Sequence, residues 1–248
     1  MPEHLTIITG ASRGLGLAMA VQRLAEGHRV LALARTETQL ASMPKGELTS
    51  WQIDLADAAP VAARLEQWLL ALDPGAAASV TLINNAGVVS APAPLGNGNH
   101  AELTQALRVG LEAPLLLSSA FLRATAAWTV PRKLLFISSG LGRRAMAGSA
   151  SYCAAKAGMD HLARAVALEE AGLPNGARVV SIAPGIIDTD MQTQLRQADA
   201  TLFPERERFV SFKNDGLLDS PAQAAAKVLS YLDRADFGSN PVADVRDA

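Results

Sequence analysis

The chain has 248 residues, a hydrophobic content of 49%, an aromatic content of 4% and a formal net charge of −2. This length fits one α/β domain over residues 1–248, with a core made mostly of aliphatic side chains. The charge argues against a nucleic-acid partner or an anionic membrane surface.

The numbers of cysteines and histidines indicate the expected cellular compartment and whether a metal site is expected. Cys153 is the single cysteine and cannot form an internal disulfide, so we expect a cytoplasmic protein. We find no apolar run of 18 residues and no leader-like start, and we therefore expect no membrane partner. Four scattered histidines and one cysteine predict no metal site.

The N-terminal segment reads as an apolar strand that leads into a glycine-rich turn. The strand is expected at 4–9, and a helical pattern follows at 14–26. Glycines at such a junction let the backbone approach a pyrophosphate, whose charge suits the helix N-terminus. The spacing Gly-x-x-x-Gly-x-Gly differs from the common dinucleotide fingerprint, and an ordinary turn is the alternative. The candidate cofactor-binding residues here are Gly10, Ser12, Arg13, Gly14, Leu15 and Gly16.

Strands and helices alternate along the rest of the chain. The expected strands lie at 29–34, 49–53, 80–84, 132–138 and 177–182. The expected helices lie at 37–43, 57–72, 100–125, 150–171 and 221–234. This alternation predicts an α/β fold with a doubly wound parallel sheet and helices on both faces. The long polar stretch at 185–219 is typical of a functional loop and is expected to cover the substrate.

The sequence has an arginine at the end of the second predicted strand. An acidic residue at that point would favour a cofactor with a free ribose 2′-hydroxyl. Arg35 follows the strand at 29–34, and Arg13 lies inside the glycine turn. Two guanidinium groups near one phosphate suit an adenosine 2′-phosphate, so the pattern favours NADP(H) over NAD(H). Two exposed surface arginines are the alternative interpretation.

Ser139, Tyr152 and Lys156 form the most informative pattern of the chain. A Tyr-x-x-x-Lys pair on a helix places a phenol and an ammonium on one face, one turn apart. The positive charge is expected to lower the pKa of the phenol, which suits proton transfer near neutral pH. Ser139 can hold a carbonyl oxygen at the same point, so we expect these three residues to be catalytic. Alone, Tyr-x-x-x-Lys would also fit a chance pair on a surface helix.

These motifs occur in the order and spacing found in the short-chain dehydrogenase/reductase family, which the chain resembles over nearly its whole length. The matching residues are Thr9, Gly10, Gly14, Gly16, Asn84, Asn85, Ala86, Gly87, Ser139, Tyr152, Lys156, Pro184 and Gly185. The C-terminal half is similar to sepiapterin reductases and bacterial benzil reductases, through segments 152–156, 167–170, 183–192 and 236–239. The resemblance implies a Rossmann-like fold and reduction of a small dicarbonyl or a pterin side chain.

The resemblance also implies cofactor contacts at several strand ends. Asp54, beside Leu55, would bind the adenine amino group, although Asp54 also suits a helix N-cap. Tyr152 and Lys156 would reach the nicotinamide ribose. The adenosine ribose would be lined by Asn85, Ala86 and Gly87. The nicotinamide carboxamide would be contacted by Pro184, Gly185, Ile187 and Thr189.

Two further positions concern the family comparison. Gly110 stands where the family usually has a helix Asn that holds a water in a proton relay. Glycine also permits a distorted helix and leaves its backbone carbonyl available. By resemblance, Asp244 would anchor the guanidine-like edge of a pterin substrate, and an exposed tail carboxylate is the alternative.

Three functions follow from these patterns. The first is an NADPH-dependent reductase of small ketones or dicarbonyls, with Tyr152 as the general acid. The second is another short-chain reductase, such as one acting on 3-oxoacyl groups, for which Arg143 and Arg144 could form a basic patch for a carrier. The third is an NADPH-binding sensor without turnover. By resemblance, we expect a homodimer or homotetramer formed through the helices at 100–125 and 150–171.

Overall fold

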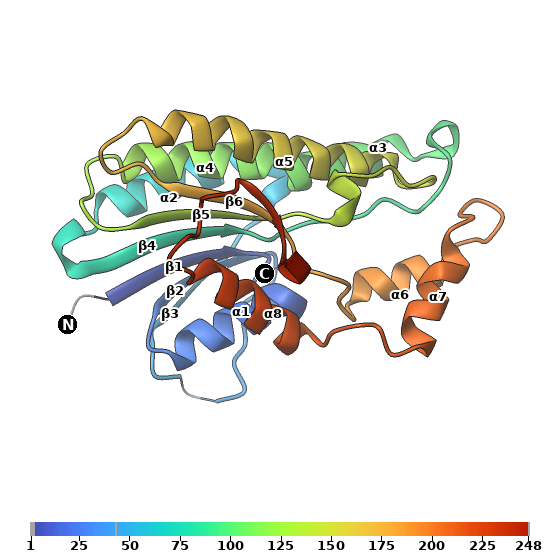
Figure 1. The fold of residues 1–248 in the computed structure, drawn as a ribbon, viewed down its shortest axis with the longest axis horizontal. Helices are drawn as coiled ribbons and strands as arrows, with labels where there is room; N and C mark the ends of the chain where they lie inside the picture. The colour runs from blue at the N-terminus through green and yellow to red at the C-terminus, as the bar shows by residue number, and fades with distance from the viewer. Residues whose placement is uncertain (1–2, 43, 248) are drawn as a thin grey trace.

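A seven-stranded parallel sheet forms the centre of the protein, which is described by a computed structural model over residues 3–42 and 44–247 (Figure 1). The strand order is β3-β2-β1-β4-β5-β6-β7, so the chain reverses its direction of growth between β1 and β4. The strands are β1 (Glu3–Thr9), β2 (Arg29–Ala34), β3 (Leu48–Gln52), β4 (Ala77–Asn84), β5 (Arg132–Ile137), β6 (Arg178–Ala183) and β7 (Val242–Asp244). This architecture confirms the predicted doubly wound α/β fold.

Helices cover both faces of the sheet. One layer holds α2 (Ala58–Leu70), α4 (Ala113–Ala124) and α5 (Ala150–Ala171) (Figure 1). The opposite layer holds α1 (Gly14–Ala25) and α8 (Pro221–Leu232) (Figure 1). No helix in the described ranges combines the length and the apolar character that crossing a membrane would need.

Two hydrophobic cores lie on the two faces of the sheet. Successive strand residues serve different cores: Ile7 packs toward α2 and α4, whereas Ile8 packs toward α1 and α8. Leu134 and Leu135 divide in the same way on β5. Side chains of a strand alternate between faces, and a parallel sheet is buried on both. The strands therefore read as continuous apolar runs in the sequence.

The predicted helix at 37–43 is wrong. Residues 37–42 have no regular structure, and Met43 lies outside the described residues. Thr38 is buried, and its backbone N–H donates a hydrogen bond to Ser50 Oγ on β3 at 3.2 Å. Pro44 disfavours helical geometry in the residue that precedes it, so a short helix at this position has little support.

The predicted helix at 100–125 is divided into three parts. It consists of α3 (His100–Leu107), a π-helical segment (Arg108–Glu112) and α4. Gly110 lies within the π-helical segment, and a Cβ built there would lie 3.0 Å from Ala155 Cβ on α5. Glycine at this position therefore allows the distorted helix to pack closely on α5.

The stretch at 185–219, expected as a loop, contains α6 (Asp190–Arg196) and α7 (Arg206–Asn214). Both helices lie away from the main helical layers (Figure 1). They share a third, small core formed by Leu195, Phe203 and Phe209, with Met146 and Met191 packed against it. The ends of the stretch are joined because Asp188 N donates to Asp219 O at 2.9 Å. The segment is thus a closed unit.

Candidate active site

A cavity of about 1350 Å³ runs along the carboxyl ends of the strands. Residues that follow β1, β2, β3, β4, β5 and β6 all contribute to its lining. In open α/β sheets, ligands bind at this edge, at the point where the strand order reverses. Every predicted catalytic and cofactor-binding residue lines this cavity, whereas Asp244 does not.

The glycine turn forms a tight backbone cradle at one part of the cavity. Gly10 and Gly14 have φ values of 66° and 55°, a region that residues with a side chain rarely adopt. A Cβ at Gly16 would overlap the carbonyl oxygen of Gly10. Asn85 Nδ2 holds the turn from β4 by donating to Thr9 O at 2.9 Å. The cradle brings the start of α1 to the cavity, which suits a pyrophosphate group.

Two arginines and one aspartate lie at the part of the cavity formed by the segments that follow β1, β2 and β3. Arg13 forms an exposed ion pair with Asp190 of α6 at 2.7 Å. The Arg35 side chain makes no hydrogen bond or ion pair within the described residues, which leaves its charge for a phosphate. Asp54 Oδ1 accepts from Ala56 N at 2.9 Å, so this carboxylate caps a short helical turn while it also lines the cavity.

The three proposed reacting groups come from β5 and α5. Ser139 follows the end of β5, and Tyr152 and Lys156 lie one turn apart on α5. Lys156 is 4% exposed and donates from Nζ to Ile137 O at 2.6 Å. The same Nζ lies 5.6 Å from the centroid of the Tyr152 ring. The side chains of Tyr152 and Ser139 interact, and both residues line the same cavity.

Burial dominates the ionisation of these groups. It raises the pKa of Tyr152 to about 12, while the hydrogen bond with Ser139 acts in the opposite direction. Burial also lowers the pKa of Lys156 to about 8, which Asp160 opposes. The expected lowering of the phenol pKa by the ammonium is therefore not found in this chain alone. At pH 7, Tyr152 is a protonated phenol and Lys156 is mostly an ammonium.

Lys156 is followed by a series of side chains with alternating charge, which consists of Asp160, Arg143, Asp244 and Arg246. Asp160, one turn further along α5, is 1% exposed and accepts from Ser181 Oγ at 2.6 Å. Arg143 Nε lies 3.3 Å from Asp160 Oδ2, and Arg143 Nη2 donates to Ala243 O at 2.7 Å. The negative charge of this buried carboxylate acts on the Lys156 ammonium and raises its pKa.

Asp244 belongs to the same series and does not line the cavity. It is buried, and its carboxylate pairs with Arg246 at 2.6 Å. Arg246 in turn lines the cavity. Arg143 lies 3.9 Å from the Asp244 carboxylate, so two guanidinium groups hold that residue and lower its pKa. The structure thus does not bring the predicted substrate anchor to the site.

Several cavity residues were missed from the sequence. They lie after Ser139, on α6 and α7 and near the C-terminus, where irregular chain gives no periodic pattern. For α6 and α7, the sequence indicated only that the 185–219 stretch covers the substrate. It did not indicate which side chains of that stretch line the cavity. The missed residues include Leu141, Met146, Met191, Leu195, Arg208, Phe209, Phe212 and Arg246. Arg144 also lines the cavity, and the sequence indicated it only as part of a basic patch for a carrier.

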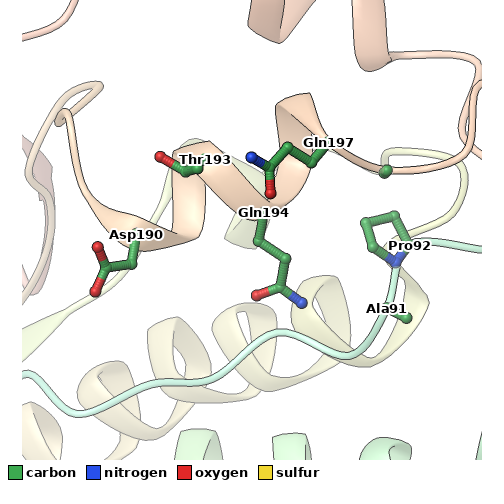
Figure 2. Close-up of a pocket in the computed structure, with 7 residues that line it drawn as sticks. Ala91, Pro92, Asp190, Thr193, Gln194 and Gln197 are labelled. Atoms are coloured by element: carbon green, nitrogen blue, oxygen red, sulfur yellow. The ribbon is translucent and has the colours of Figure 1, made fainter.

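A smaller pocket of about 390 Å³ lies between α6 and the segment that carries Ala91 and Pro92 (Figure 2). Gln194 extends from α6 toward the segment that carries Ala91 and Pro92 (Figure 2). Asp190 lines both pockets and is the only ionisable side chain among the described residues around the smaller one. Within the described ranges, no group of three or more His, Cys, Asp or Glu side chains could hold a metal ion.

The sheet, the glycine cradle and the Ser-Tyr-Lys arrangement define a class, the Rossmann-type oxidoreductases that use a nicotinamide cofactor. The sequence model of the short chain dehydrogenase family matches residues 4–200. The chain belongs to this family, as the motif pattern predicted.

Named relatives and solved structures agree with this assignment. The chain is 36% identical to benzil reductase ((S)-benzoin forming) of Bacillus subtilis (strain 168), covering 93% of this chain and 94% of that one. It is 32% identical to sepiapterin reductase of Mus musculus, with 97% and 96% covered. The crystal structure of the KRED1-Pglu enzyme matches with a TM-score of 0.80 and 25% identity, over 97% of this chain and 99% of that one. The crystal structure of a metagenomic short-chain oxidoreductase in complex with NADP matches with a TM-score of 0.70 and 27% identity. The match covers 97% of this chain and 94% of that one.

Proposed function

We propose that the protein is an NADPH-dependent carbonyl reductase that acts on small ketones or dicarbonyls, of which sepiapterin and benzil are reference compounds. The observation that carries this proposal is that Ser139, Tyr152 and Lys156 line the same cavity as the glycine cradle. NADPH would supply a hydride there. The names of the relatives, benzil reductase and sepiapterin reductase, support a carbonyl as the acceptor.

Each reacting residue has a distinct role in this proposal. Tyr152 donates its proton to the carbonyl oxygen, and a phenol whose pKa is about 12 is fully protonated for that step at neutral pH. Ser139 donates a hydrogen bond to the same oxygen and orients it. Lys156 supplies a buried positive charge that stabilises the phenolate left behind. Its hydrogen bond to Ile137 O fixes the position of that charge.

The preference for NADPH is supported by Arg35 and Arg13. Both line the cavity, and the Arg35 charge is unpaired within the described chain. A ribose 2′-phosphate would neutralise it, whereas a free 2′-hydroxyl would not. The predicted contacts of the nicotinamide with Pro184, Gly185, Ile187 and Thr189 remain part of this proposal, since all of them line the cavity.

The alternatives are separated by one experiment. NADPH oxidation is measured with benzil, 1-phenyl-1,2-propanedione, sepiapterin and an acetoacetyl thioester. Turnover of the diketones or sepiapterin supports the proposal, and turnover of the thioester alone favours a 3-oxoacyl reductase. Arg143 is held by Asp160 and Ala243, which weakens the basic patch that the 3-oxoacyl function would use. Tight NADPH binding without turnover of any compound would favour the sensor.

We also propose that the chain forms a cytoplasmic homodimer or homotetramer through α4 and α5. Two large apolar side chains on these helices support an interface, Leu168 at 80% exposure and Leu115 at 48%. Exposed apolar side chains on adjacent helices are typical of surfaces that associate. The residues 1–248 would act as one catalytic unit in each copy.

A further inference from the structure

The charged side chains that line the main cavity are mostly neutralised by protein partners. Arg13 pairs with Asp190, Asp188 with Lys213, Arg208 with Glu205 and Arg246 with Asp244. Among the arginines of the cavity, the side chains of Arg35 and Arg144 make no hydrogen bond or ion pair within the described residues. An unpaired guanidinium in a ligand cavity is a natural receptor for an anionic group.

These two arginines lie in different parts of the cavity. Arg35 follows β2 and Arg144 follows β5, with β1 and β4 between those strands. Neighbouring strands are about 4.8 Å apart, so three strand spacings separate the two positions by roughly 14 Å. One small phosphate cannot reach both. If Arg35 serves the cofactor, the exposed guanidinium of Arg144 is available for another anion.

The position of Arg144 relates it to the carbonyl site. Its backbone N donates to Gly140 O at 3.1 Å, which folds the chain back toward Ser139. A Cβ built on Gly140 would lie 3.9 Å from Arg144 Nε, so the guanidinium lies over the residue next to Ser139. An anion bound by Arg144 would therefore be close to the carbonyl oxygen that Ser139 and Tyr152 hold. A carboxylate joined directly to the carbonyl carbon has that geometry.

Apolar side chains complete the remainder of the substrate region. Met146, Met191, Phe209 and Phe212 line the cavity, and the Phe209 and Phe212 rings meet edge to face at 5.8 Å. Aromatic and thioether surfaces of this kind pack well against a flat hydrocarbon substituent. The cavity thus offers a cation on the Ser139 side and an apolar wall from α6 and α7.

We propose that Arg144 binds a carboxylate next to the reacting carbonyl, so that the preferred substrates are 2-oxo acids that carry an aromatic or aliphatic substituent. This inference rests on the carbonyl reductase function proposed above. The carbonyl carbon accepts the hydride of NADPH, and its oxygen accepts the Tyr152 proton. The products are the 2-hydroxy acid and NADP⁺, and the carboxylate is unchanged.

A matched pair of compounds tests this specificity. Benzoylformate and benzoylformamide have nearly the same shape, but only benzoylformate carries a carboxylate. With the wild-type protein and NADPH, we expect kcat/KM to be about tenfold or more higher for benzoylformate, because a charged hydrogen bond contributes roughly this factor. Higher salt should reduce the advantage. Equal values for the two compounds, or a preference for the amide, would overturn the inference.

Variants assign the effect to one side chain. Arg144→Gln should lower kcat/KM for benzoylformate at least tenfold more than for benzoylformamide, and Arg144→Lys should restore part of the difference. A purely structural role of Arg144 would lower both values equally, which would contradict the proposal. Arg164→Gln is the control, because Arg164 is exposed on α5 and does not line the cavity; its ratio should match that of the wild type.

Product binding separates this inference from the proposed function. Titration of the NADP⁺-loaded protein with mandelate and with mandelamide requires no turnover. Tighter binding of mandelate that Arg144→Gln abolishes supports the carboxylate site even if no carbonyl is reduced, in which case the proposed function alone fails. Reduction of neutral diketones without Arg144-dependent binding of mandelate overturns the carboxylate site and leaves the reductase function standing.

Discussion

Tyr152 is the residue whose hydroxyl must lose a proton in the proposed reduction. We predict that Tyr152→Phe lowers kcat about 100-fold or more, because a general acid typically contributes a factor of this size. Fluorescence titration should show nearly unchanged NADPH binding, since the ring and the packing of α5 remain. Turnover close to the wild-type value in this variant would rule out Tyr152 as the proton donor.

The charge of Lys156 gives a pH dependence with a defined direction. Its pKa of about 8 means that the ammonium, and with it kcat/KM, is lost as pH rises through 8, while Tyr152 stays protonated over this range. Asp160 opposes the lowering of the Lys156 pKa. We predict that Asp160→Asn moves the alkaline limb of the kcat/KM profile to lower pH.

The matched control for this pH profile is Ser181→Ala. It removes the 2.6 Å hydrogen bond to Asp160 Oδ1 but leaves the carboxylate charge and its contact with Arg143. Its alkaline limb should stay near that of the wild type. If both variants shift the limb equally, local packing rather than the Asp160 charge sets the Lys156 pKa.

Arg35 is expected to decide the choice of cofactor. We predict that Arg35→Asp lowers the ratio of kcat/KM for NADPH to that for NADH by about tenfold or more, because a charged contact to the 2′-phosphate is lost. Lys45→Asp, an exposed cation outside the cavity, should leave the ratio unchanged. An unchanged NADPH to NADH ratio of kcat/KM in Arg35→Asp would show that another residue recognises the ribose 2′ position.

At the level of secondary structure elements, the glycine cradle depends on backbone contact between α1 and β1. A methyl group at Gly16 would overlap the Gly10 carbonyl, so Gly16→Ala must displace the start of the helix. We predict at least tenfold weaker NADPH binding by calorimetry and a free energy of unfolding lowered by about 1–3 kcal/mol. Gly172→Ala is the control, since a Cβ there has open space. Unchanged NADPH affinity in Gly16→Ala would mean that the cradle is not used.

The elements that could be predicted from sequence are those whose pattern is set by burial. Strands such as Val30 to Ala34 are apolar on both faces, and the long helices carry a periodic apolar stripe, so both were located within a few residues. The wrong helix at 37–43 was a short segment where contact between Thr38 and Ser50 decides the conformation. Such contacts join residues that are separated in the sequence and leave no local pattern.

The same distinction applies to the site. Residues that follow strands could be placed at the cavity because their backbone position is fixed by the sheet, as for Ser139 and Asn85. The side chains of α6 and α7 were not found, because their place over the cavity depends on a small core around Phe203 that includes Met146 from a distant segment. Asp244 was assigned to the substrate, yet its carboxylate pairs with the neighbouring Arg246 and lies near Arg143 from a distant part of the chain.

At the scale of the whole molecule, α4 and α5 expose two large apolar side chains, Leu115 and Leu168, which would be covered in an oligomer. We predict a dimer or tetramer for the wild type by light scattering, and smaller particles for the double variant Leu115→Lys and Leu168→Lys, because two charges would be buried in the interface. Leu217→Lys changes a leucine between α7 and α8 whose exposure, 58%, lies between those of Leu115 and Leu168, and it should leave the size unchanged. A monomeric wild type would contradict the proposed interface.

The closed unit formed by α6 and α7 has an evolutionary consequence. Its two helices share a small core, to which Met146 contributes from another segment, and backbone hydrogen bonds between residues 186–188 and Asp219 hold its two ends together. Natural variation could therefore exchange this module among homologues without disturbing the dinucleotide cradle. New ketone preferences would then arise by replacing a module, while the machinery of hydrogen transfer is inherited intact.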